Sequence, residues 1–129
     1  MPKFGDRSTQ NLSQAHPDLQ KLFNRVIQLF DCSVICGHRN QADQEAAFHS
    51  GASTKHWPDS KHNSIPSLAV DVVPSPIEWE DTNRMRYFAG MVMGVAAEMG
   101  VKIRWGGDWN GNTDLKDQKL HDLPHFEIM

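Results

Sequence analysis

The sequence lacks the features that mark membrane, secreted and nucleic-acid-binding proteins. In its 129 residues there is no run of about eighteen apolar residues, the length that a membrane span needs, and no apolar secretory segment near the N-terminus. Its thirteen lysines and arginines are scattered, and the formal net charge is -3. The sequence therefore lacks the clustered basic residues that mark a nucleic-acid-binding protein. We expect a cytoplasmic protein with neither nucleic acid nor a stable membrane association among its partners.

Cysteine is also scarce, with Cys32 and Cys36 both in the segment CSVIC. The β-branched centre of this segment predicts a strand, whose rise separates the two Cα atoms by roughly 13 Å. A disulfide bond cannot span that distance. Because there is no second cysteine pair to complete a cysteine-rich zinc site, we expect two reduced thiols in the core.

The length and the 39% hydrophobic content suit one compact core, so residues 1–129 are expected to form a single small domain. Helical spacing of apolar residues and helix end signals predict helices over 17–30, 41–51 and 81–100. Short apolar segments predict strands at 33–37, 68–73, 101–105 and 125–128. The expected fold class is α+β, with a short, mostly antiparallel sheet and flanking helices.

Two long polar segments, 51–66 and 106–122, interrupt these elements. Long loops inside compact domains are often functional. The second segment contains several oxygen-bearing side chains that suit calcium, at Asp108, Asn110, Asn112, Asp114 and Asp117. Their spacing is not that of an EF-hand. A solvated loop is therefore favoured, and calcium binding stays open.

Among seven histidines, His62 comes just before the predicted strand that carries Asp71, and His125 begins the last predicted strand. His62, Asp71 and His125 make a three-ligand set that leaves one zinc position open for water, as in catalytic sites. Asp71 lies within the apolar segment LAVDVV, where a carboxylate is costly unless it is paired or bound to a metal. An outward-facing acid on a half-exposed strand fits the residues equally well.

Asp122, three residues before His125, is either a solvated loop acid or a base beside the metal. The residues alone favour the solvated acid. His121 is expected to point to the opposite face of an extended segment and to contribute at most indirectly.

Four segments, CGHRNQADQ, SKHNSIPSLAVDVVP, RWGGDW and DLPHFEI, occur in this order along the chain. Together they resemble the M15 family of zinc peptidases. That family includes phage endolysins of the L-alanyl-D-glutamate type, D-Ala-D-Ala carboxypeptidases and the vancomycin-resistance dipeptidases. The resemblance covers nearly the whole chain and implies a fold like that of hedgehog and the D-Ala-D-Ala peptidases.

The resemblance also implies the chemistry of the site. It makes His62, Asp71 and His125 the ligands of Zn²⁺, Asp122 the catalytic base, and Arg39 the group that steadies the substrate carbonyl as an oxyanion. The chain departs from the family pattern in one place. Eight residues separate His62 from Asp71, more than is usual in the family, and Ser67 stands where a glycine is usual. The additional residues, with Pro66 among them, are expected to form a bulged loop.

Other polar and aromatic residues are weaker candidates. Gln44 and Glu45 can line a cleft, but solvation on a helix face is the favoured interpretation. The tryptophans can wall a substrate cleft or pack in the core, and these two possibilities are level for Trp57, Trp105 and Trp109.

The function implied by the resemblance is a zinc-dependent peptidoglycan peptidase that cleaves the L-Ala-D-Glu bond of the stem peptide. We expect a monomeric phage endolysin that stays in the host cytoplasm until the membrane opens and then acts on the cell wall. The short chain without a signal segment favours this type over the alternative of a D-Ala-D-Ala carboxypeptidase or dipeptidase. A non-catalytic zinc-binding wall module is a further alternative, but it would need neither Asp122 nor Arg39.

Overall fold

The computed structural model describes residues 2–118 and 121–129. Within them the chain forms a four-stranded sheet in the order β1-β2-β4-β3, in which each neighbouring pair is antiparallel. The strands are β1 (Cys32–Cys36), β2 (Ala69–Pro74), β3 (Ile103–Trp105) and β4 (His125–Ile128). This sheet and its flanking helices confirm the expected α+β class.

The helices include one that the sequence did not predict. They are α1 (Asp6–Ser13), α2 (Pro17–Leu29), α3 (Gln41–His49) and α4 (Thr82–Met99), with short 3₁₀ turns η1 (Lys61–Asn63) and η2 (Leu115–Asp117). Helix α1 buries only Ser8 and Leu12, so it carries no apolar period that would reveal it. Tertiary hydrogen bonds hold it instead, because Val34 N donates to Ser8 Oγ and Asn11 Nδ2 donates to Val34 O.

The core lies where α2 and α4 pack against the sheet. Helix α2 begins at Pro17, where a missing N–H costs nothing, and the His16 side chain accepts from Asp18 N. Helix α4 ends at Gly100, whose φ of 72° is a left-handed conformation that glycine adopts without strain. Phe126 at the centre of β4 is fully buried, and its ring lies 5.4 Å from that of Phe23 on α2. Burying such a side chain contributes about 1.5–3 kcal/mol.

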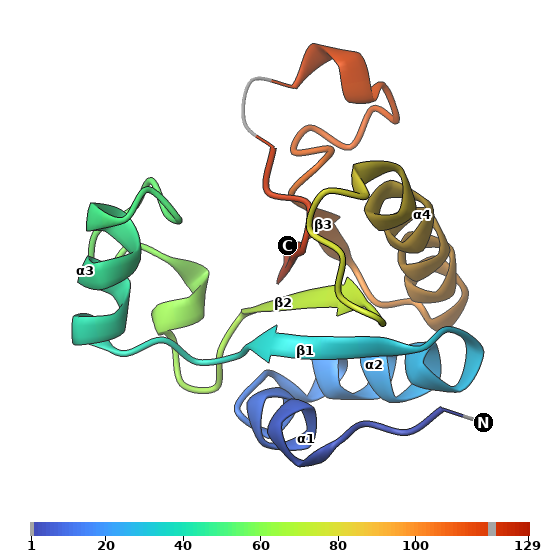
Figure 1. The fold of residues 1–129 in the computed structure, drawn as a ribbon, viewed down its shortest axis with the longest axis horizontal. Helices are drawn as coiled ribbons and strands as arrows, with labels where there is room; N and C mark the ends of the chain where they lie inside the picture. Colours follow the sequence, from blue (N-terminus) through green and yellow to red (C-terminus); the bar gives the residue numbers. More distant parts are fainter. Residues whose placement is uncertain (1, 119–120) are drawn as a thin grey trace.

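Helix α3 and the polar segment that leads from it to β2 lie beyond the end of β1. Figure 1 shows α3 standing apart from the sheet, on the side toward which β1 runs. The loop that returns to β2 is anchored at Ser67, which is fully buried and pairs with the turn before α2 through Ser67 N to Gln14 O and His16 N to Ser67 O. These bonds fix the lengthened segment between His62 and Asp71.

The second long loop, between β3 and β4, is bonded largely to itself over its described part. Thr113 N donates to Asp108 Oδ2, and the Asn112 amide donates to Asp117 Oδ2. Lys119 and Leu120, which were expected in this loop, lie outside the described residues. Among the helices of the described segments, none has the length and apolar character needed to cross a membrane.

Candidate active site and metal cluster

Asp71 lies at the centre of the candidate site because of the strand register. It is the partner of Cys36 on β1 and of His125 on β4. Its Oδ1 is 3.2 Å from His62 Nε2 and 3.3 Å from His125 Nδ1. The side chain is only 14% exposed, so the outward-facing alternative for this acid is wrong. A carboxylate buried in this strand is stabilised by its polar partners.

His62 is held in one orientation by its surroundings. It lies in η1, where its backbone N–H donates to Ser60 Oγ, and the residue is 2% exposed. Its Nδ1 is 2.8 Å from the carbonyl oxygen of Gly37. Because a carbonyl oxygen only accepts, Nδ1 carries the hydrogen, and the lone pair of the neutral ring is on Nε2, facing Asp71.

Gly37, whose carbonyl oxygen faces His62, can pack closely against α1 because it has no side chain. A Cβ at this position would lie 2.1 Å from the Asn11 carbonyl oxygen of α1. Only glycine therefore permits the close contact between α1 and the segment after β1.

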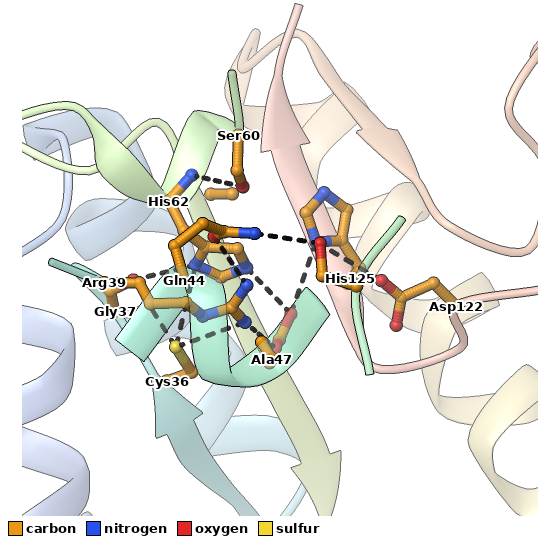
Figure 2. A network of polar contacts seen from close by, with 12 residues as sticks. Cys36, Gly37, Arg39, Gln44, Ala47, Ser60, His62, Asp122 and His125 are labelled. Atoms are coloured by element: carbon orange, nitrogen blue, oxygen red, sulfur yellow. Dashed lines mark hydrogen bonds and ion pairs between the residues drawn. The ribbon is translucent and has the colours of Figure 1, made fainter. Parts of the chain in front are cut away.

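His125 presents the other ring nitrogen to Asp71, Nδ1 in place of the Nε2 that His62 presents. Its Nε2 lies 2.8 Å from Oε1 of Glu127, and its Nδ1 faces Asp71 and lies 3.7 Å from Asp122 Oδ2. The His62 and His125 rings meet edge to face with 5.2 Å between centroids. Figure 2 shows His62 and Arg39 on one side of the cluster and His125 with Asp122 on the other.

The charges in this cluster are strongly coupled. Burial favours the neutral form of Asp71, but the hydrogen bonds from His125 and His62 outweigh it and hold the pKa of Asp71 well below its usual range. Burial likewise opposes a charge on His62, but the hydrogen bond to Asp71 raises the pKa of His62 to about 10. Without a metal, the two imidazoles thus share protons around an ionised carboxylate. A divalent cation that binds there displaces such protons.

Asp122 lies beside Nδ1 of His125, the ring nitrogen that faces Asp71. Burial and the nearby charge of Asp71 raise the pKa of Asp122. A carboxylate with a raised pKa accepts a proton more readily than an exposed aspartate.

A metal ion can be held by side chains of this cluster. Ligand atoms of Cys36, His62 and Asp71 lie within 4.8 Å of one another. The expectation for Cys36 is therefore wrong in part, because it is half-buried beside His62, whereas Cys32 is in the core. Both thiols are free, as expected. The three-residue set that the sequence suggested shares His62 and Asp71 with this cluster and has His125 in place of Cys36.

Gln44 holds Arg39 beside the cluster. The Gln44 side chain is fully buried, which contradicts the solvated interpretation. Its Oε1 accepts from Arg39 Nη1 at 3.0 Å and from Asn63 Nδ2 at 3.1 Å, and its Nε2 donates to the Lys55 carbonyl oxygen at 2.7 Å. The Arg39 Nη2 atom in turn lies 3.7 Å from Asp71 Oδ2. Glu45, the other candidate on α3, is half-buried and bonds to His56 and Trp57 N.

A cleft of about 340 Å³ opens over these residues. Five predicted site residues line it, namely Arg39, His62, Asp71, Asp122 and His125. The rest of the wall includes the loop 51–55, Lys61, Arg104, Trp109, His121 and Glu127. Trp109 lies against His125 with 5.4 Å between ring centroids, whereas Trp105 is in the core and donates from Nε1 to Leu123 O. Trp57 is half-buried away from the described lining of the cleft.

His121 and Asp122 both line the cleft, although an extended segment was expected to place their side chains on opposite faces. The segment turns at Leu123 and Pro124 before β4 begins, and His125 N donates to Asp122 O across that turn.

The profile of the phage L-alanyl-D-glutamate peptidase family matches residues 1–129. The chain belongs to this family. It is 31% identical to the L-alanyl-D-glutamate peptidase of Escherichia phage T5 over 135 aligned positions, which cover 98% of each chain. It is also similar to the crystal structure of the L-Ala D-Glu endopeptidase ChiX of Serratia marcescens, with 31% identity and a TM-score of 0.76 over 98% of this chain and 90% of that one.

Membership of this peptidase family confirms the resemblance drawn from the four sequence segments. It also confirms that the chain is a peptidase of the L-alanyl-D-glutamate type. The cleft and its polar cluster are thus the candidate active site of an enzyme, and the non-catalytic wall module loses its support.

Proposed function

We propose that the chain hydrolyses the L-Ala-D-Glu bond of peptidoglycan stem peptides with the help of Zn²⁺ held by His62, Asp71 and His125. Asp122 is the general base and Arg39 binds the substrate carbonyl. The observation that carries this proposal is the convergence of His62 Nε2 and His125 Nδ1 on the same oxygen of Asp71. Two imidazoles and one carboxylate form a donor set typical of catalytic zinc.

His125 is a better third ligand than Cys36 because the two residues lie beside different ring nitrogens of His62. The Cys36 sulfur lies 3.8 Å from Nδ1 of His62, the nitrogen whose hydrogen is donated to Gly37 O. That nitrogen has no lone pair to offer a metal. The available lone pair, on Nε2, points to Asp71 and His125 instead. An ion bound through Nε2 therefore has His125, and not Cys36, on its side of the ring.

The metal ion, when bound, supplies a Lewis acid that polarises a carbonyl group and acidifies a coordinated water. The chain supplies the remaining chemistry. Asp122, beside His125 Nδ1, takes the proton of the attacking water on its carboxylate and passes it to the leaving amine. Arg39 has five N–H donors, and those not used by Gln44, Cys36 and Asp71 are available to the oxyanion that forms in the cleft.

Membership of a phage peptidase family supports a proposal for the biological setting. We place the enzyme in the host cytoplasm until the membrane opens, after which it reaches the cell wall as a phage endolysin. It acts as a monomer. A single domain is supported by one continuous core among the described residues and by a family match over residues 1–129.

Zinc content tests the ligand set. The purified protein should hold about one zinc per chain. His62→Ala, Asp71→Ala and His125→Ala should each lower that content sharply, whereas Cys36→Ala should keep it. If Cys36→Ala lost its zinc and His125→Ala retained it, the ligand set would be Cys36, His62 and Asp71 instead.

The products of digestion test the bond that is cut. Purified Gram-negative peptidoglycan treated with the enzyme should gain new N-terminal D-Glu, with its glycan strands intact, as read by mass spectrometry of the fragments. Release of D-Ala or the D-Ala-D-Ala dipeptide would point to the carboxypeptidase or dipeptidase activity.

A further inference from the structure

Glu127 is a buried acid outside the proposed ligand set. It lies on β4 two residues after His125, so the two side chains are on the same face of the strand. The residue is 6% exposed, and carboxylates are almost never so buried unless they are paired. Its partners are His125, Lys61 and Arg104.

The contact with His125 is the shortest of the three. Glu127 Oε1 lies 2.8 Å from His125 Nε2. An ionised carboxylate only accepts hydrogen bonds, so Nε2 must carry the hydrogen, and the lone pair of the neutral ring is on Nδ1. The acid thus selects the tautomer whose free nitrogen faces Asp71.

The other oxygen of Glu127 connects two further segments. Oε2 lies 3.2 Å from Lys61 Nζ and 3.7 Å from Arg104 Nη1 on β3. Lys61 immediately precedes His62 in η1, and its Nζ also donates to the Ile128 carbonyl oxygen on β4. These contacts join the turn that carries His62 to the strand that carries His125.

We propose that Glu127 is a positioning residue for metal binding, which fixes the His125 tautomer and, through Lys61, ties the His62 turn to β4. This inference rests on the proposed role of His62 and His125 as ligands. A carboxylate that holds the second nitrogen of a ligating histidine sets the direction of its lone pair and raises its basicity. Arg104, from the neighbouring strand, places a second cation beside the same carboxylate oxygen.

The proposal is tested by the zinc affinity of Glu127→Ala, measured by competition with a chromophoric chelator. Loss of such a partner costs about 10- to 100-fold in metal affinity. Glu127→Gln keeps the size of the side chain and one acceptor for His125 Nε2, so its affinity should fall between those of Glu127→Ala and the unmodified protein. Lys61→Met leaves the His125 contact intact and should weaken zinc binding less than Glu127→Ala.

A second measurement separates positioning from a general effect on folding. Long-range ¹H–¹⁵N spectra of the zinc-bound protein, in which the ligating rings are neutral, report which nitrogen of each imidazole carries the hydrogen. In Glu127→Ala and Glu127→Gln the Nε2–H form of His125 should lose population, more so in the alanine variant. Unmodified zinc affinity together with an unchanged His125 tautomer in both variants would overturn the proposal. Retention of zinc by His125→Ala would instead refute the ligand set on which the proposal rests.

Discussion

Asp71 on β2 and His125 on β4 are direct partners in the sheet, and their side chains meet with 3.3 Å between Oδ1 and Nδ1. This relationship places a carboxylate and an imidazole on rigid strands and not on loops. His62 alone approaches from a turn, and the hydrogen bond from its Nδ1 to Gly37 O restrains it. Sites built on regular elements are held more firmly than sites on loops.

The first prediction is that the two histidines bind zinc through different nitrogens. His62 should bind through Nε2 because Nδ1 donates to Gly37 O, and His125 through Nδ1 because Nε2 donates to Glu127. Long-range ¹H–¹⁵N spectra with and without zinc measure this directly. His16, whose Nδ1 accepts from Asp18 N, is the control and should not shift when zinc is added. Binding of zinc through Nε2 of both rings would contradict the orientation of His125.

The second prediction concerns the buried amide that supports Arg39. Gln44→Leu keeps a similar volume but removes the acceptor for Arg39 and Asn63 and the donor to Lys55 O. Leaving a buried polar group without its partner costs about 1–3 kcal/mol, so the free energy of unfolding should fall by that amount in urea titrations. Gln41→Leu, at an exposed position on the same helix, should change it by less than about 0.5 kcal/mol. Equal stability of the two variants would show that the Gln44 network contributes little.

Much of the fold was predictable because its helices and strands bury apolar faces with a regular period. The periods over α2 and α4 locate both helices to within a residue or two of their observed ends. Helix α1 was missed because it has no such period and is held by hydrogen bonds to Val34, a contact that local sequence does not reveal.

Only those residues of the candidate site that belong to short sequence motifs could be predicted from the sequence. The structure brings together the predicted residues His62, Asp71, Asp122 and His125. Arg39 joins them through its contact with Asp71. Gln44 and Cys36 were misjudged because their surroundings come from distant segments. Glu127 did have a local signal, since an acid two residues after a histidine in an apolar strand lies on the same face.

The third prediction distinguishes the two thiols. Cys32 is 3% exposed, and burial together with the charge of Asp31 raises the pKa of its thiol to about 12. Because the thiolate is the reactive form, Cys32 should resist alkylation in the folded protein at pH 8. Cys36 is half-buried and should be labelled more quickly, as counted by mass spectrometry. In Cys36→Ser, label should enter only after denaturation, and rapid labelling of the folded variant would show that Cys32 is accessible.

The last prediction separates catalysis from metal binding and depends on Asp122. Its carboxylate lies 3.7 Å from Nδ1 of His125 but belongs to neither candidate ligand set. Asp122→Asn keeps the shape and polarity of the side chain while removing the proton acceptor, so zinc content should stay near that of the unmodified enzyme. Turnover should nevertheless fall by about 100- to 10,000-fold, the usual cost of losing general acid-base catalysis.

The matched control for Asp122 is its neighbour in the cleft. His121→Ala removes a side chain from the same wall but leaves the carboxylate in place, and its turnover should fall much less. Rates are compared at equal zinc occupancy on purified peptidoglycan, so that lost metal cannot imitate lost catalysis. Near-normal turnover of Asp122→Asn under these conditions would remove Asp122 from the mechanism, because an amide cannot replace a general base without a large loss of rate.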